Sequence, residues 1–294
     1  MTIAISLKVN DGVVLAADSA STLVGRDETG GPSGVVNVYN HANKVFNLRK
    51  GLPIGAITWG SGSIGPASIS TLAKDVRRRF SGKDPDHSDW HLDPDNYTIE
   101  QVAERLRGFI YDELYVPAYD DWPDDQRKPD LGFIVAGYSS NAAMADEFQI
   151  AIVNGDCEPP LALRQGETSG LTWNGQPEAI SRQLLGFDPA LPDVMQNLLG
   201  VPQDQIGPAI ETIRSALQSP LVQAAMPFQD AIALAEFLVD LTIKVSRFAP
   251  GAPTVGGEIE IAAISKHEGF KWVRRKHYFQ RDFNQEDFRA RYES

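Results

Sequence analysis

The first residues of the chain alternate between apolar and polar side chains. The apolar positions fall on one side of an extended chain: Ile3, Ile5, Leu7 and Val9. This period of two predicts a half-buried strand. The turn residues Asn10-Asp11-Gly12 follow, and the apolar run 13–17 predicts a second strand. The chain is therefore expected to begin with a β-hairpin.

Further periodic segments predict both strands and helices. Strands are expected at 43–48, 53–59, 131–137, 148–153, 258–264 and 270–274, with weaker candidates at 162–164 and 171–173. Helices are expected at 66–80, where Pro66 suits the first helical position, and at 98–114, 178–185, 206–217 and 228–248. Thr98 and Gln101 form a capping box at the start of one of them. The last helix is apolar nearly all round, which predicts that it is buried.

The order of these elements predicts an α+β fold. Strands, helices, strands, helices and strands follow one another, which fits one layered domain better than a βαβ repeat. We expect this domain to span 1–280, with inserts at about 81–97, 117–130 and 187–226 and a C-terminal tail at 281–294. Residues 19–42, rich in Gly, Ser, Thr and Asn, are expected to form a long excursion.

Composition limits the classes of function. Of the 294 residues, 42% are hydrophobic and 22% are charged, which is typical of a globular protein. The 27 Lys and Arg against 39 Asp and Glu give a net charge of −12, which disfavours binding to nucleic acid or an anionic membrane surface. A local basic patch remains compatible with this total.

Few residues suit metals, disulfides or membranes. Cys157 is the single cysteine, and the five histidines show no metal-ligand spacing, so we expect no metal and no cofactor. No signal peptide is evident, and Glu236 and Asp240 interrupt the longest apolar helix, so it is not a membrane span. The default expectation is a cytoplasmic protein.

Two charged residues near the start of the chain are expected to pair. A three-residue loop at 10–12 would pair Ala4 with Asp18 and place Thr2 on the face of the Asp18 side chain. Asp18 follows a wholly apolar run, and a carboxylate there needs a partner. Lys44, at the start of the next predicted strand, is the candidate. We expect the attraction of the carboxylate to outweigh burial, so that Lys44 stays charged at neutral pH.

Thr2 has the chemistry of a nucleophile. It follows the initiator Met1 and is small enough for that methionine to be removed. Removal creates an α-amino group whose pKa is ordinarily about 7.7–8.0, so it can act as a base near neutrality. A threonine that carries its own terminal amine is an activated nucleophile.

These residues together resemble the start of proteasome β-type subunits and their bacterial relatives. The similar segments are Thr2-Ile-Ala-Ile, Asp11-Gly-Val-Val-Leu-Ala-Ala-Asp18-Ser19 and Asn43-Lys44-Val45. The family consists of N-terminal-nucleophile (Ntn) hydrolases with a four-layer αββα sandwich. The resemblance implies that Thr2 is the catalytic threonine, Asp18 the active-site aspartate and Lys44 the active-site lysine. The spacing from Thr2 to Asp18 (18 − 2 = 16) agrees with the family, whereas that to Lys44 (44 − 2 = 42) is longer.

The resemblance also implies supporting residues. The glycine run 60–65 corresponds to the region that binds the developing oxyanion, with Gly62 as first choice and Gly60 as second. Ser19 and Asn174 are implied as binding residues, Asn174 in place of a serine of the family. The supporting Asp and Ser that the family has before its late glycine pair are absent or shifted at Gly256.

The run 60–65 also matches a dinucleotide-binding fingerprint. A Rossmann unit needs another apolar strand that ends in an acidic residue, but residues 81–97 are polar and rich in Pro and Asp, which disfavours this alternative.

The sequence therefore predicts a threonine peptidase acting on peptides or unfolded proteins. The resemblance further implies a homo-oligomer, with the inserts and the tail as candidate contacts, and an ATPase unfoldase as a candidate partner. Two alternatives stay open: a catalytically silent, assembly-forming homologue, and an Ntn amidase that acts on a small amide.

Overall fold

Two antiparallel sheets form the centre of the molecule. The structure, a computed structural model, describes residues 2–26, 32–123 and 125–277. The first sheet has the order β13-β1-β2-β14-β15, with bounds Gly170–Gly175, Ile3–Val9, Gly12–Ala17, Glu260–Ser265 and Gly269–Arg274. The second has the order β11-β10-β9-β6-β5, with bounds Asp156–Cys157, Asp146–Val153, Leu131–Gly137, Ile54–Gly60 and Val45–Asn47. Strand β12 (Leu161–Arg164) also pairs with β10.

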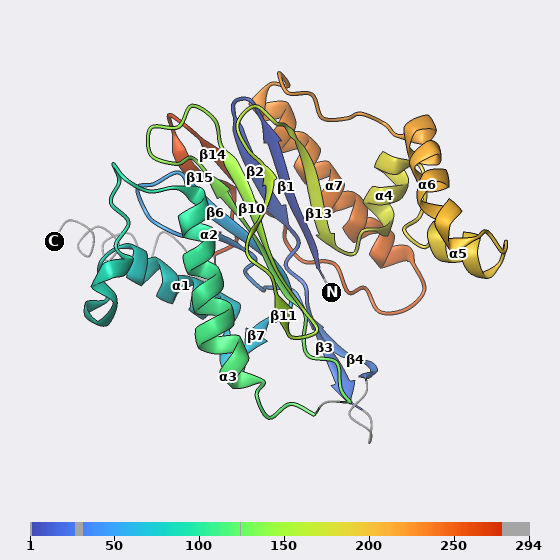
Figure 1. The fold of residues 1–294 in the computed structure, drawn as a ribbon, viewed down its shortest axis with the longest axis horizontal. Helices are drawn as coiled ribbons and strands as arrows, with labels where there is room; N and C mark the ends of the chain where they lie inside the picture. The colour runs from blue at the N-terminus through green and yellow to red at the C-terminus, as the bar shows by residue number, and fades with distance from the viewer. Residues whose placement is uncertain (1, 27–31, 124, 278–294) are drawn as a thin grey trace.

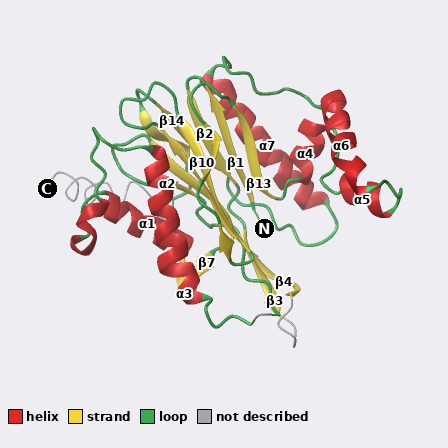
Figure 2. Cartoon of the chain, viewed as in Figure 1, coloured by secondary structure: helices red, strands yellow, loops and turns green. Residues whose placement is uncertain are grey.

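Helices cover the outer face of each sheet (Figures 1 and 2). On the second sheet lie α1 (Ile69–Phe80) and α2 (Ile99–Arg107), and α2 continues into a π-helix (Gly108–Tyr115) and α3 (Val116–Ala118). On the first sheet lie α4 (Glu178–Leu185) and α7 (Phe228–Phe248). Beyond α4 lie α5 (Leu191–Asn197) and α6 (Gln203–Leu217). The predicted α+β fold is confirmed, and both sheets are antiparallel.

Strand β1 is buried on both faces, not half-buried as its pattern predicts. All seven of its residues are buried. Ile3, Ile5 and Leu7 pack towards α4 and α7, whereas Ala4 packs between the two sheets. Alternation predicts one wet face only when nothing covers the polar side, and here the second sheet covers it.

The first hairpin has a shorter turn than predicted. Val9 pairs with Gly12 and Ala4 with Ala17, so the loop contains two residues, not three. Asp18 then lies beside Ile3, whose carbonyl accepts a hydrogen bond from the Asp18 amide at 3.3 Å. Thr2 and Asp18 therefore do not share a face of the β1–β2 ladder, although the three-residue loop had predicted that they would. The contact between the Asp18 carboxylate and the N-terminal strand has another origin, which lies in the geometry of the site.

The excursion at 19–42 contains a β-hairpin that the sequence analysis missed. Strands β3 (Ser21–Arg26) and β4 (Pro32–Tyr39) pair with each other and extend away from both sheets at the bottom of Figure 1. Several of its large apolar side chains are exposed: Leu23, Val24, Val35, Val36 and Tyr39. These residues form a surface that we call the apolar hairpin.

The structure confirms some of the helix predictions and corrects others. The capping box of Thr98 and Gln101 is confirmed, and α4 and α7 have the predicted bounds. Helix α1 begins at Ile69 with Ser68 as its cap, because Pro66 lies in the tight turn between β7 (Ser63–Ile64) and β8 (Ala67–Ser68). Helix α7 is buried on one face only, and Phe237 and Phe248 are exposed, contrary to the prediction of a wholly buried helix.

The dinucleotide alternative is contradicted by the strands around residues 60–65. Strand β6 is antiparallel to both neighbours in its sheet, and the small β7–β8 hairpin, not a helix, follows it directly. A Rossmann unit requires parallel strands joined by a helix.

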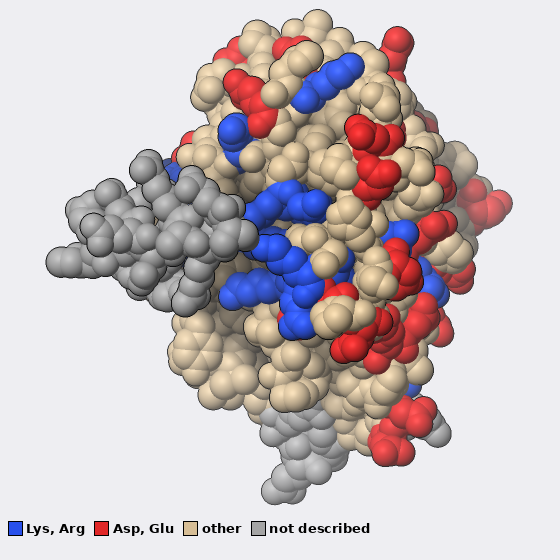
Figure 3. Space-filling view, turned by 90° about the vertical axis from the view of Figure 1, so that its left-hand side faces the viewer, with Lys and Arg blue, Asp and Glu red and all other residues tan. Residues whose placement is uncertain are grey.

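Charge is unevenly distributed on the surface. On the face that Figure 3 shows, Lys and Arg side chains gather near the centre, while Asp and Glu side chains lie mainly along one edge. The net charge of −12 thus coexists with a local basic area. Within the described ranges, every helix is too short or too polar to cross a membrane. The predicted tail at 281–294 lies outside the described residues.

Candidate active site

The carboxylate of Asp18 is fully buried and accepts four hydrogen bonds. Its Oδ1 accepts from Ile3 N at 3.0 Å and from Lys44 Nζ at 2.5 Å. Its Oδ2 accepts from Ala20 N and Gly256 N, both at 3.0 Å. The predicted pairing of Asp18 with Lys44 is thus present, and three backbone amides replace water around the remaining lone pairs. One of these amides belongs to the residue that follows Thr2.

Lys44 lies at the entry to β5 with its side chain buried. Its side chain is 7% exposed, and its carbonyl accepts from Thr58 N at 2.9 Å, which ties it to β6. Burial lowers the pKa of Lys44 below its ordinary value of 10.5, and the attraction of Asp18 offsets this only in part. The pKa of Lys44 is thus shifted in the direction opposite to the expected one, whereas the charge of Lys44 at neutral pH stays a prediction. The lysine is easier to deprotonate than a lysine in water.

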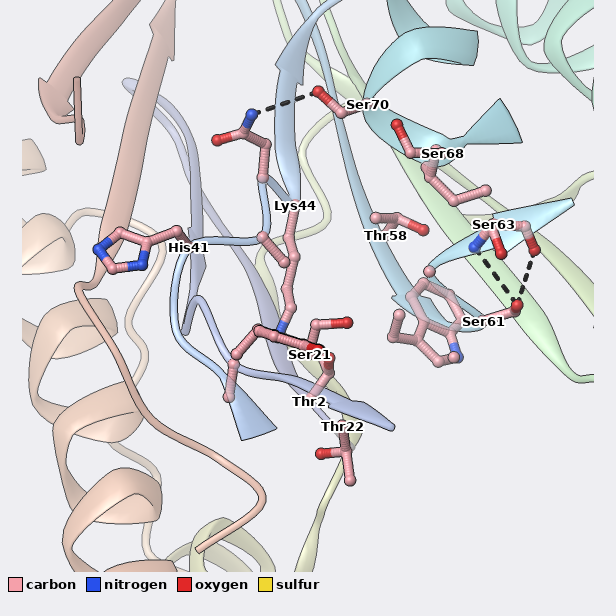
Figure 4. A pocket seen from close by; sticks show the side chains of 18 of the residues that line it. Thr2, Ser21, Thr22, His41, Lys44, Thr58, Ser61, Ser63, Ser68 and Ser70 are labelled. Atoms are coloured by element: carbon pink, nitrogen blue, oxygen red, sulfur yellow. Dashed lines mark hydrogen bonds between the residues drawn. The ribbon is translucent and has the colours of Figure 1, made fainter. Parts of the chain in front are cut away.

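Thr2 lies where the ion pair meets a cavity. It is buried, and its carbonyl accepts from Gln176 N at 2.8 Å. Figure 4 shows the Lys44 side chain directed towards Thr2 and Ser21. Thr2 and Lys44 both line a cavity of about 600 Å³. A threonine, a buried lysine and a buried carboxylate are thereby brought together from the residues next to the ends of β1, β5 and β2.

Gly175 holds the backbone of Thr2 from the neighbouring strand. Its φ is +104°, and a Cβ placed there would lie 1.9 Å from the carbonyl oxygen of Thr2. No other residue fits without moving Thr2, because the obstacle is backbone and the conformation disfavours side chains.

We expect Gly175→Ala to destabilise the protein by about 1–3 kcal/mol, since it combines backbone strain with a backbone clash. Gly251→Ala is the matched control, because Gly251 has a φ of +106° and open space around it. Urea unfolding of both variants measures the difference. Equal losses for the two variants would show that the contact with Thr2 costs nothing.

Residues with a hydroxyl group are the largest group in the lining of the cavity. Figure 4 shows several of them around the hollow beside Lys44, namely Thr58, Ser61, Ser63, Ser68 and Ser70. Trp59 lines this cavity and also an adjoining one of about 350 Å³ that Thr2 borders too. The described lining of the larger cavity contains no Asp, Glu or Arg.

The glycine run supplies one unused amide at the cavity. Ser61 N donates to Asp130 O at 2.8 Å, whereas Gly62 N has no acceptor among the described residues. Gly60 has a φ of +89°, and a Cβ there would lie 2.4 Å from Asp130 O, so it serves the close approach of two backbone segments. Gly62 is therefore the better candidate for oxyanion binding, as the sequence analysis proposed.

The other predicted binding residues have different surroundings. Asn174 lies opposite Ala4 in the β1–β13 ladder, and its Nδ2 is buried without an acceptor in the described part of the chain. Ser19 does not line either cavity beside Thr2; its Oγ donates to Glu258 O at 2.5 Å. The roles of all these residues in binding or catalysis stay predictions.

Two buried charged residues at the site were missed by the sequence analysis. Glu260 in β14 is 2% exposed, and Lys276 lies 3.1 Å from it. Glu260 stands within an apolar run, the same signal that pointed to Asp18, so it could have been found. Lys276 carries no comparable signal. No group of three or more His, Cys, Asp or Glu residues suited to a metal ion occurs in the described ranges.

Comparisons with known proteins reveal a shared fold. No family model and no curated protein matches the chain. Among solved structures, the chain is similar to a bacterial protein of the proteasome-like class. That protein is Anbu from Hyphomicrobium sp. strain MC1, solved as a Gly-1 mutant, with a TM-score of 0.51 and 12% identity over 100% of this chain and 96% of the other. At this identity the likeness concerns the fold alone.

Proposed function

We propose that the protein is a threonine-type N-terminal-nucleophile hydrolase that cleaves peptide bonds, with the four-layer αββα architecture of that class. The observation that carries the proposal is the buried Asp18–Lys44 pair, directed at Thr2 on the wall of a cavity. The proteasome-like fold of the structural neighbour supports the same class.

The chemistry begins with the removal of Met1, which frees the α-amino group of Thr2. Oγ of Thr2 attacks the peptide carbonyl, and the amine takes the hydroxyl proton directly or through a water. The Gly62 amide donates to the developing oxyanion. The amine then gives its proton to the leaving nitrogen, and water hydrolyses the ester to restore Thr2. The ammonium of Lys44 disfavours protonation of the nearby amine, and Asp18 fixes Lys44.

Mass spectrometry and an activity assay test this proposal together. The intact mass of the purified chain reports whether Met1 has been removed, and fluorogenic peptides and small amides are offered to the same sample. Turnover of peptides by a processed chain supports the proposal. Turnover of small amides alone would favour an amidase, and a processed chain inactive on both classes would favour the silent homologue.

The cavity lining predicts a preference for uncharged polar side chains. Hydroxyl groups can bond Ser, Thr, Asn or Gln. The described wall has no carboxylate or guanidinium, and the ammonium of Lys44 on this wall is already paired with Asp18. We expect peptides with these residues before the cleaved bond to be favoured about five- to tenfold in kcat/KM, the equivalent of one net hydrogen bond. A positional-scanning peptide library measures this, and a preference for Arg, Asp or Leu there would contradict it.

The apolar hairpin supports self-association, which is also what the silent homologue would require. Val36 is 64% exposed and Tyr39 is 59% exposed, on a hairpin that leaves the body of the molecule. Exposed apolar groups of this kind mark interaction surfaces. Sedimentation velocity at micromolar concentration should show species larger than 32.2 kDa, and Val36→Asp should shift them towards the monomer. A wild-type monomer at all concentrations would refute assembly.

A further inference from the structure

A second buried ion pair lies behind the Asp18–Lys44 pair. Lys276 follows β15, and its Nζ lies 3.1 Å from Oε2 of Glu260, with the two side chains 8% and 2% exposed. The same ammonium donates to Ala42 O at 2.6 Å and to Ser19 Oγ at 2.7 Å. Three acceptors from three separate segments thus converge on one buried nitrogen.

The groups that Lys276 holds are next to the two members of the first ion pair. Ser19 follows Asp18 directly, and Ala42 precedes Lys44 by two residues. The two segments are also joined to each other, since Ala42 N donates to Ser19 O at 2.9 Å. Glu260 completes the arrangement, because its Oε2 also accepts from Lys44 N at 3.4 Å. Among the described residues, the bonds that Lys276 and Glu260 make outside their own pair therefore end on Ser19, on Ala42 or on the backbone of Lys44.

Resting on the proposed function, we propose that Lys276 is a positioning residue of the threonine site, which fixes Asp18 and Lys44 relative to Thr2. Lys276 lines neither cavity beside Thr2, so it acts through the residues it holds and does not touch the substrate. Misplacing a reacting group by a fraction of its diameter is enough to slow a reaction strongly, which makes such a clamp consequential.

Lys276 also acts on Lys44 through charge. The described groups that influence Lys44 are Asp18 and Glu260, which raise its pKa, and Lys276, which lowers it in addition to burial. Lys276 itself is influenced by Glu260, Glu258 and Asp18, and burial lowers its pKa. Removing the ammonium of Lys276 therefore raises the pKa of Lys44. A residue that only secured the end of β15 would not have this effect.

The experiment compares Lys276→Met, Lys276→Arg and Lys271→Met. Lys271 is exposed on β15, the strand that precedes Lys276, which makes it the matched control. The kcat and KM for a peptide are measured from pH 6 to pH 11 (the working range around the ordinary pKa values of the amine and lysine, about 7.7 to 10.4). The titration of Lys44 is followed in parallel by NMR of ¹³Cε-labelled lysine, which needs no turnover.

For Lys276→Met we expect kcat to fall about tenfold or more with little change in KM. The alkaline limb of the pH profile and the NMR titration of Lys44 should both move to higher pH. Lys276→Arg keeps the charge, so it should restore the position of the alkaline limb, but its planar fork does not meet the same acceptors and kcat stays reduced. Lys271→Met should match the wild type.

The inference is overturned if Lys276→Met folds, keeps the wild-type kcat and leaves the titration of Lys44 unmoved. If Lys276→Met does not fold, Glu260→Gln with Lys276→Met leaves no unpaired buried charge and takes its place in the measurement of kcat and KM, where a wild-type kcat would overturn the inference. Its Lys44 titration is not compared, because the loss of Glu260 and the loss of Lys276 move the pKa of Lys44 in opposite directions. Failure of the proposed function would give a different result, because the Thr2→Ala variant would then be as active as the wild type. Failure of this inference leaves Thr2→Ala inactive and Lys276→Met fully active.

Discussion

Replacing Thr2 by alanine is expected to abolish peptide hydrolysis. Alanine removes the hydroxyl and the γ-methyl group, and it is as compatible with removal of Met1 as threonine, so the α-amino base remains. The backbone bond from Gln176 N to the carbonyl of residue 2 also remains. Loss of a nucleophile that acts together with its base costs on the order of 10⁴-fold or more in kcat.

The measurement pairs Thr2→Ala with Thr2→Ser. Both processed variants are checked by intact mass and by thermal unfolding and are then assayed with the same peptide. Serine keeps a hydroxyl on the same carbon, so Thr2→Ser should retain measurable activity. A processed Thr2→Ala variant that cleaves the peptide at the wild-type rate would remove Thr2 from the mechanism and, with it, the assignment to this class of hydrolase.

The sequence predicted the Asp18–Lys44 pair correctly, because the rule that a buried charge needs a partner depends on burial alone. Asp18 ends an apolar run, and a charge in that position requires a partner wherever the chain leads. Lys44 is that partner. The same rule applied to Glu260 would have revealed the second pair. Lys276 lies far along the chain after an exposed strand, and only the packing of β15 beside β14 brings it to Ser19 and Ala42.

The geometry around Asp18 could not be derived from strand parity. Asn10-Asp11-Gly12 suits loops of two or three residues, and the structure has the two-residue loop. Asp18 lies just beyond the end of β2, where the ladder no longer fixes the side-chain direction. Its carboxylate therefore turns to the amide of Ile3 and to the closing segment at Gly256, which no sequence pattern connects to residue 18.

Alternation predicted where strands lie but not which faces are wet. The even positions of β1 include Ser6 and Lys8, which are buried although polar, because Ser6 Oγ donates to Glu147 of β10 and Lys8 Nζ donates to Gly166 O. Within 19–42, the short apolar groups at 22–24 and 35–38 are the only local signal for β3 and β4, and glycines and polar residues dilute it. Sheet-on-sheet contact and an exposed hairpin are both properties of the whole fold.

Replacing Lys44 by alanine is expected to lower kcat on the order of 10²-fold or more, the effect of removing an oriented electrostatic group from a water-poor site. It also leaves the fully buried Asp18 carboxylate without its cation, which costs about 3–5 kcal/mol of stability for a broken buried pair. Asp18→Asn combined with Lys44→Met removes both charges, so we expect it to recover stability but not turnover. This double variant separates the loss of chemistry from the loss of folding.

The pH profile of the wild type gives the second measurement on Lys44. Activity should rise as the Thr2 amine loses its proton, near or below its ordinary pKa of about 7.7–8.0. As the pH rises further, activity should fall again, with a midpoint below pH 10.5, because burial lowers the pKa of Lys44. The neutral lysine loses both its bond to Asp18 and its influence on the amine. Lys44→Arg should also lose most activity, since a planar guanidinium does not replace a compact ammonium between Asp18 and Thr2. A Lys44→Ala variant with normal turnover and an unchanged pH profile would show that the buried pair serves the fold alone. Another group would then have to keep the α-amino group of Thr2 neutral, so that it can accept the proton of the Thr2 hydroxyl.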